Sequence, residues 1–157
     1  MKTLLSIVAL AMSVAAGQAA KIDKANISND AKFVVHLDLD AFRASKIGTA
    51  ILEKIRGDEG EKLDALVEIM GFDPLSAFHG ATMFGNGEED NGILVLKHKA
   101  DSTKLLAFMK LDEYYRKTEH GIHEIHGAGD RGDSKRGYVS FVNATTAVLA
   151  ASRELAA

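Results

Sequence analysis

The sequence predicts an α+β fold, with a largely antiparallel sheet, about three helices packed on one face, and a β-meander at the end. Two observations lead to this prediction. Segments that alternate apolar and polar residues, as half-buried strands do, are interspersed with segments whose apolar residues recur at helical spacing. The later strand segments are joined by short turns, which favour antiparallel pairing.

The first strand is expected over 32–39, "KFVVHLDL", where apolar and β-branched residues alternate with polar ones. Asp40 then provides a side chain suited to the N-cap of a helix over 41–55. The segment "GDEG" is expected to separate this helix from a second one over 61–70, and Gly71 suits the C-terminal cap of that second helix.

The rest of the chain alternates in the same way. A helix is predicted from Asp101 or Ser102 to Leu111. His120-Gly121 and Asn143-Ala144 are expected to be turns of the meander, since glycine adopts the positive φ of a tight turn without strain. The predicted strands are 81–85, 92–99, 114–120, 122–127, 137–143 and 146–152.

The first twenty residues form a predicted secretory signal rather than part of the fold. Lys2 precedes an apolar run that ends in small residues, and we expect cleavage after Ala19 or Ala20. The mature domain is then 21–157, exported to the periplasm or secreted, with no integral membrane segment left after the signal is removed.

Composition limits the classes of partner. The signal carries one Lys and no acid, so 18 basic and 22 acidic residues remain and the formal charge becomes −4. A nucleic-acid partner is therefore not expected, because such partners require a basic surface. There is no cysteine, so stability has to come from an ordinary core, which a single domain of this length can bury.

The final segment, "SRELAA", is typical of the start of a helix, with Ser152 as N-cap and Glu154 in the first turn. One helical turn is not stable alone. We therefore expect either that the chain is the N-terminal part of a longer protein or that this element is completed by another chain.

The segments "NDAKFVVHLDLDAFRASKIGTAIL", "MGFDPLSAFHGATMFG" and "NGILVLKHKADSTKLLAFM" resemble a group of uncharacterised secreted bacterial proteins. The resemblance covers most of 28–126 and about 137–154. It implies an exported protein whose chain continues into a further helix and often a second, similar half. It implies no assigned activity and no catalytic residue.

His36, Asp38 and Asp40 are the strongest chemical cluster in the sequence. In an extended strand they share one face, opposite Val35 and Leu37, and imidazole and carboxylate groups can converge there on a divalent cation. The favoured interpretation is structural: a solvated strand face, with Asp40 engaged as a helix cap.

Two further motifs carry weaker signals. His120, His123 and His126 cannot converge on a strand, where Glu124 and His126 share the face opposite His123. Arg131-Gly132-Asp133, within "DRGDS", matches the adhesion tripeptide read by integrins, in a loop whose residues are also those of any solvated hairpin.

These observations favour an exported, non-catalytic α+β domain with a binding or envelope-associated structural role. Its partner would be a protein or envelope component of unknown identity. No cofactor is predicted under this hypothesis. The alternative is a metal-dependent hydrolase that uses His36, Asp38 and Asp40 around a divalent cation.

Overall fold

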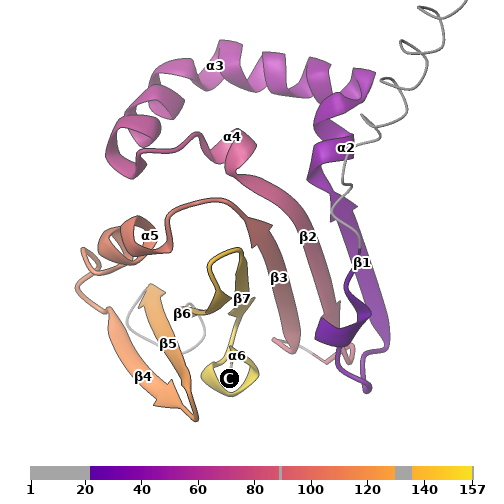
Figure 1. Ribbon diagram of the computed structural model, residues 1–157, viewed down its shortest axis with the longest axis vertical. Helices are drawn as coiled ribbons and strands as arrows, with labels where there is room; N and C mark the ends of the chain where they lie inside the picture. The colour runs from indigo at the N-terminus through magenta and orange to yellow at the C-terminus, as the bar shows by residue number, and fades with distance from the viewer. Residues whose placement is uncertain (1–21, 89, 130–135, 157) are drawn as a thin grey trace, which may run out of the picture.

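The computed structural model describes residues 22–88, 90–129 and 136–156, and its centre is one sheet (Figure 1). The predicted α+β class, with an antiparallel sheet and a terminal β-meander, is confirmed. The seven strands lie in the order β1-β2-β3-β7-β6-β5-β4, and every neighbouring pair is antiparallel. The strands are β1 (Phe33–Asp38), β2 (Phe78–Gly85), β3 (Gly92–His98), β4 (Arg116–His120), β5 (His123–Gly129), β6 (Arg136–Asn143) and β7 (Thr146–Ala150).

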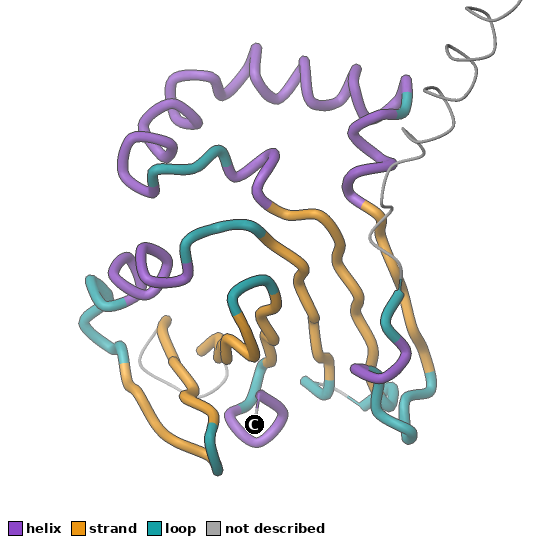
Figure 2. The backbone as a smooth tube through the Cα atoms, viewed as in Figure 1, coloured by secondary structure: helices purple, strands orange, loops and turns teal. Residues whose placement is uncertain are grey.

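The helices lie at the ends and on the faces of this sheet (Figure 2). They are η1 (Lys24–Asn26, a 3-10 turn), α2 (Leu39–Ala44), α3 (Lys46–Met70), α4 (Pro74–Ala77), α5 (Ser102–Met109) and α6 (Arg153–Ala156). The long helix α3 lies beyond the ends of β2 and β3 (Figure 1) and contacts α2, α4 and α5. No helix among the described residues is both long enough and apolar enough to cross a membrane.

The start of the first helix differs from the prediction. Asp38, rather than Asp40, is the N-cap of α2, and its side chain accepts a hydrogen bond from the backbone N–H of Ala41 at 2.9 Å. The predicted helix over 41–55 is also interrupted at Ser45, which is extended (ψ 154°). The Ser45 hydroxyl accepts from the N–H of Gly48 at 2.9 Å and so caps α3, a role that serine takes more readily than a mid-helix position.

The predicted break at "GDEG" is found inside α3, where two helical segments meet at a kink. Only Glu59 leaves helical geometry (φ −125°, ψ 16°), which makes a kink rather than a loop. Ion pairs between Lys54 and Asp58 and between Glu59 and Lys62 join successive turns on either side of the kink. Gly71 ends the helix in the left-handed conformation (φ 71°), as predicted.

The meander has the expected turns. Gly121 has a φ of 59° in the turn between β4 and β5, where His120 and His123 are the last paired residues. In the turn between β6 and β7, the Asn143 side chain accepts a hydrogen bond from the N–H of Thr145 at 2.9 Å. Both turns give register to the pairs that follow.

The two faces of the sheet are covered differently. We call the face that carries Leu94, Leu96, Val139, Phe141 and Leu149 the pocket face, because α5 lies over it and leaves a cavity there. Ile125 lies on the opposite face, where it forms a buried cluster with Ala150 of β7 and Ala156 of α6, against which Tyr138 and Leu155 pack. This packing supplies α6 with the stability that one turn lacks on its own.

In α6, the Ser152 hydroxyl accepts from the N–H of Leu155 at 3.3 Å, as predicted for an N-cap.

The exposure of β1 is the reverse of the prediction. Val35 and Leu37 do lie opposite His36, but they are 56% and 47% exposed, whereas His36 is half-buried. The helices that follow β1 leave its end instead of folding back over these side chains. The exposed apolar strip on β1 and β2, on the pocket face of the sheet, consists of Phe33, Val35, Leu37 and Met83.

Candidate functional site

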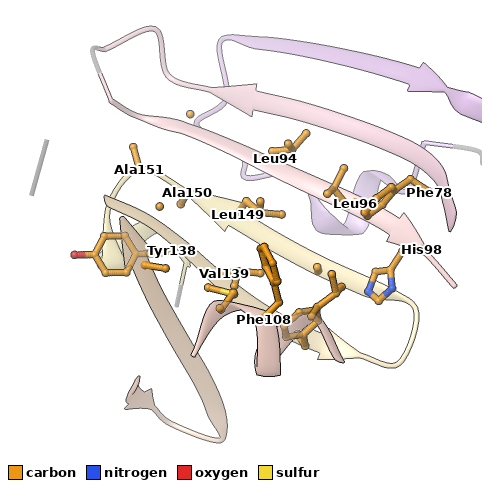
Figure 3. Close-up of a pocket in the computed structure, with 17 residues that line it drawn as sticks. Phe78, Leu94, Leu96, His98, Phe108, Tyr138, Val139, Leu149, Ala150 and Ala151 are labelled. Atoms are coloured by element: carbon orange, nitrogen blue, oxygen red, sulfur yellow. The ribbon is translucent and has the colours of Figure 1, made fainter. Parts of the chain in front are cut away.

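A cavity of about 500 Å³ lies between the pocket face and α5 (Figure 3). Strands β3, β6 and β7 form its floor, and α5 forms one wall. In Figure 3, Tyr138 and Ala151 lie toward one end, Phe78 and His98 toward the other, and Phe108 between them. The lining residues are Phe78, Gly92, Leu94, Leu96, His98, Leu105, Phe108, Met109, Ala128, Gly137, Tyr138, Val139, Phe141, Ala147, Leu149, Ala150 and Ala151.

The part of the lining that the structure describes contains no Asp, Glu, Lys or Arg. Its size falls within the range of small-molecule sites, about 300–1,000 Å³, and such sites are mainly apolar with few polar groups. The polar side chain that the described lining places on this face is the imidazole of His98, whereas the side chain of Tyr138 packs on the opposite face and its hydroxyl points away from the cavity in Figure 3. The chemistry of this lining is therefore suited to binding an apolar molecule.

Two glycines contribute to the volume of the cavity, because they place no side chain in it. Gly92 of β3 and Gly137 of β6 line the cavity, and a Cβ built on either one would meet nothing within 4 Å among the described residues. Glycine weakens a strand interior and often marks a place where another group approaches closely. The small side chains of Ala128 and Ala147 leave further space between the larger leucine and phenylalanine side chains of the lining.

Helix α5 closes the cavity only in part. Its N-cap, Asp101, accepts a hydrogen bond from the N–H of Thr103 at 2.9 Å, which fixes the start of the helix. Leu105, Phe108 and Met109 then face the sheet, but Phe108 remains 44% exposed. The ring of Phe108 thus forms part of the cavity wall and part of the outer surface, so it lies at the opening of the cavity.

His98 is the polar group that is built into the site. It is 1% exposed, and its Nδ1–H donates to the carbonyl oxygen of Ala100 at 3.1 Å. Its ring lies between Phe78 and Phe141, with centroids 6.4 and 5.9 Å away, the latter edge-on. Its Nε2 is buried and has no hydrogen-bond partner among the described residues.

The predicted cluster of His36, Asp38 and Asp40 is separated by the structure. His36 Nδ1 lies 2.8 Å from the hydroxyl of Thr82 on the opposite face of the sheet, while Asp38 caps α2. Asp40 belongs to the first turn of α2 rather than to the strand, so it does not continue the alternation. Among the described residues, no group of three His, Cys, Asp or Glu side chains is placed to hold a metal ion.

Asp40 instead joins α2 to β2. It pairs with Arg43 and accepts from His79 Nδ1 at 3.0 Å, and Arg43 also donates to the carbonyl oxygens of Leu75 and Phe78. Burial alone would raise the pKa of Asp40, but hydrogen bonds from His79 and Arg43 outweigh it and lower the pKa. This network ties the start of α2 to the segment that enters β2.

The three histidines of the meander do not converge, as predicted. Glu124 and His126 share a face, with His126 Nε2 3.7 Å from the Glu124 carboxylate, and Lys117 pairs with Glu124. His126 is 3% exposed, stacks on Tyr115 and bonds to its hydroxyl at 2.9 Å. Burial lowers the pKa of His126, and the charge of Glu124 opposes part of that effect.

The predicted adhesion tripeptide, Arg131-Gly132-Asp133, lies outside the described residues, as do the predicted cleavage positions Ala19 and Ala20. Comparison with known protein families, with curated proteins and with solved structures returns no match for this chain.

The cavity was not foreseen from the sequence, although two signals for it are present there. In "GILVLKH", His98 continues the alternation of Leu94 and Leu96, which predicts an imidazole on an apolar face. Gly92 and Gly137 begin predicted strands that face the same cavity. Their convergence depends on the pairing of β3 with β7 and of β7 with β6, which local pattern does not reveal.

Proposed function

We propose that this protein is an exported, non-catalytic binding domain whose site is the cavity between the pocket face and α5. The observation that carries the proposal is the cavity itself, with its volume of about 500 Å³ and no charged side chain among the described residues that line it. Burial of apolar ligand surface in such a site is favourable by about 25 cal/mol per Å² before the costs of association. The ligand is a small apolar or amphipathic molecule of the kind that an envelope supplies.

Metal-dependent hydrolysis has less support. The carboxylates of Asp38 and Asp40 are engaged by a helix N-terminus and by Arg43 with His79, and these bonds explain both residues without a ligand. His36, on the sheet, has Thr82 as a partner.

The proposal is tested by binding of N-phenyl-naphthylamine, a dye whose fluorescence rises in apolar surroundings. We expect saturable binding to the wild-type mature chain and loss of at least about 90% of the signal in Gly137→Leu and in Gly92→Leu, because the added side chains enter free space within the cavity. Both variants should melt at or above the wild-type temperature, since leucine is a better strand residue than glycine.

The matched control is Gly57→Leu. Gly57 lies on the exposed part of α3, away from the cavity, and a Cβ there also meets nothing within 4 Å. This variant should bind the dye as the wild type does. Undiminished dye binding in both cavity variants, with their melting curves intact, would show that the ligand binds elsewhere.

A further inference from the structure

The buried Nε2 of His98 is a polar atom at a position where an apolar side chain would lower the stability of the fold less. Unpaired buried polar atoms each cost roughly 1–3 kcal/mol, and most native ones have a partner. His98 Nε2 is buried and has none among the described residues. Phenylalanine or leucine would fill this position between Phe78 and Phe141 without that penalty.

The state of the ring follows from its other nitrogen. The carbonyl oxygen of Ala100 can only accept, so the 3.1 Å contact requires the proton on Nδ1. In the neutral ring, Nε2 then carries a lone pair and accepts a hydrogen bond. A partner for this atom has to supply a donor, and the ring belongs to the lining of the cavity.

The charge of the lining limits what that donor can be. Among the described residues no acidic or basic side chain faces the cavity, so an ionised ligand group beside His98 would be buried without a counter-charge from them. An uncharged hydroxyl meets both requirements: it donates one hydrogen bond and loses little on leaving water once that bond forms.

We propose that the cavity binds an uncharged amphiphile through its hydroxyl group, which donates to Nε2 of His98 while the apolar chain extends toward Tyr138. This inference rests on the proposed function of the cavity. The ring belongs to the lining but Nε2 is buried, so the bond forms after a small rotation of the ring about its terminal torsion, for which the energy well is broad.

In the opposite orientation of the ligand, its polar head would lie at the Tyr138 end of the cavity, and that head would have to be anionic. A second hollow of about 700 Å³ shares Tyr138 and Ala151 with the apolar cavity, and its lining includes Arg116, Lys117 and Arg153. Two acids, Asp90 and Glu154, face the same hollow, and Lys117 and Arg153 already pair with glutamates. The acids and the existing ion pairs weaken the attraction of this second hollow for a carboxylate head. The unpaired acceptor on His98 therefore favours a hydroxyl head more strongly than the second hollow favours a carboxylate.

The test compares three probes of similar length, each by displacement of N-phenyl-naphthylamine from the wild-type mature chain in mildly alkaline buffer. They are n-decanol, methyl nonyl ether, which accepts but cannot donate, and decanoate, which is ionised. We expect n-decanol to bind about tenfold more tightly than the ether, as one buried hydrogen bond gained corresponds to roughly that ratio. Decanoate should bind more weakly than n-decanol.

The variant His98→Asn tests the contribution of Nε2 to ligand binding. Its amide nitrogen can keep the bond to Ala100, while no acceptor remains where Nε2 was. We expect the preference for n-decanol over the ether to fall below about threefold, with binding of the ether unchanged. Unchanged ether binding also shows that the variant is folded, and His98→Phe serves the same purpose if the asparagine variant does not fold.

Equal affinities for n-decanol and the ether in the wild type would overturn this inference while leaving the cavity as the binding site. Tighter binding of decanoate than of n-decanol would also overturn it, in favour of the orientation toward Arg116 and Arg153. Failure of all three probes to displace bound dye would count against both the inference and the proposed site.

Discussion

At the scale of single residues, the acidic side chains at the end of β1 have roles in folding. Asp38 satisfies a backbone N–H at the start of α2, and Asp40 links that helix to His79 and to the segment held by Arg43. A residue type that suits a metal site is thus explained by capping and pairing. The sequence could not separate Asp38 from Asp40 as the cap, because both precede apolar residues of helical spacing.

Asp38→Ala is expected to lower the free energy of unfolding by about 1 kcal/mol, the usual loss for an N-cap. Urea denaturation of the chain from Lys21 onward measures it. Asp64→Ala, which removes an exposed carboxylate from the middle of α3, is the matched control and should stay within about 0.5 kcal/mol of the wild type. Equal effects of the two substitutions would mean that the cap contributes nothing.

His126 makes stability depend on pH in a predictable direction. Burial lowers its pKa in the folded protein, so the unfolded chain binds the proton first as the pH falls. The contribution of the neutral ring is fully present above the unfolded pKa of about 6.5 and is lost as the pH falls through the folded value.

Urea denaturation of wild type and His126→Phe over a pH series checks this expectation. The phenylalanine can keep the stacking on Tyr115 but cannot titrate. Its stability should therefore fall less steeply than that of the wild type below about pH 6.5, and parallel profiles would contradict the assignment.

At the scale of elements, the junction between α2 and α3 depends on close approach of the backbone. A Cβ at Gly48 would lie 1.8 Å from the carbonyl oxygen of Phe42 and 2.6 Å from its carbonyl carbon. Both are backbone atoms, so the turn at Ser45 would have to open to accept any side chain. The compact junction therefore requires glycine at this position.

Gly48→Ala is expected to destabilise the protein by at least about 2 kcal/mol, as overpacking against backbone does. Gly57→Ala, on the same helix but in open space, should stabilise it by about 0.5–1 kcal/mol. Thermal melts of the two variants give the comparison. An equal gain from both would mean that the chain is not held at this junction as described.

Prediction at this scale succeeded where local chemistry decides. The glycine at 121, the asparagine at 143 and the glycine at 71 marked turns and a helix end, and each is found there. It failed where two local rules conflict. Ser45 interrupts a continuous helical pattern by capping, and "GDEG" kinks the helix at Glu59 where its glycines predict a loop.

At the scale of the whole molecule, the cavity arises from pairing between distant segments. Leu94 of β3 pairs with Leu149 of β7, and Leu149 with Val139 of β6, so the floor comes from two parts of the chain that a helix and a hairpin separate. The α+β class followed from order and periodicity. The site did not, because which strands become neighbours is settled by the packing of the complete sheet.

The same register extends the apolar surface beyond the cavity. Val35 of the exposed apolar strip pairs with Met83, and Met83 with Leu94, which already lines the cavity. The molecule therefore offers two adjoining apolar surfaces on one face, the enclosed one under α5 and the open one on β1 and β2. We propose that the ligand binds at the enclosed surface.

Photolabelling tests that assignment most directly. A long-chain alcohol carrying a diazirine would be photolysed with the chain from Lys21 onward, and the labelled peptides identified by mass spectrometry. We predict label in β3, β7 and α5, reduced by excess n-decanol. Label concentrated on β1, or label that follows surface exposure and resists competition, would contradict a ligand site in the cavity.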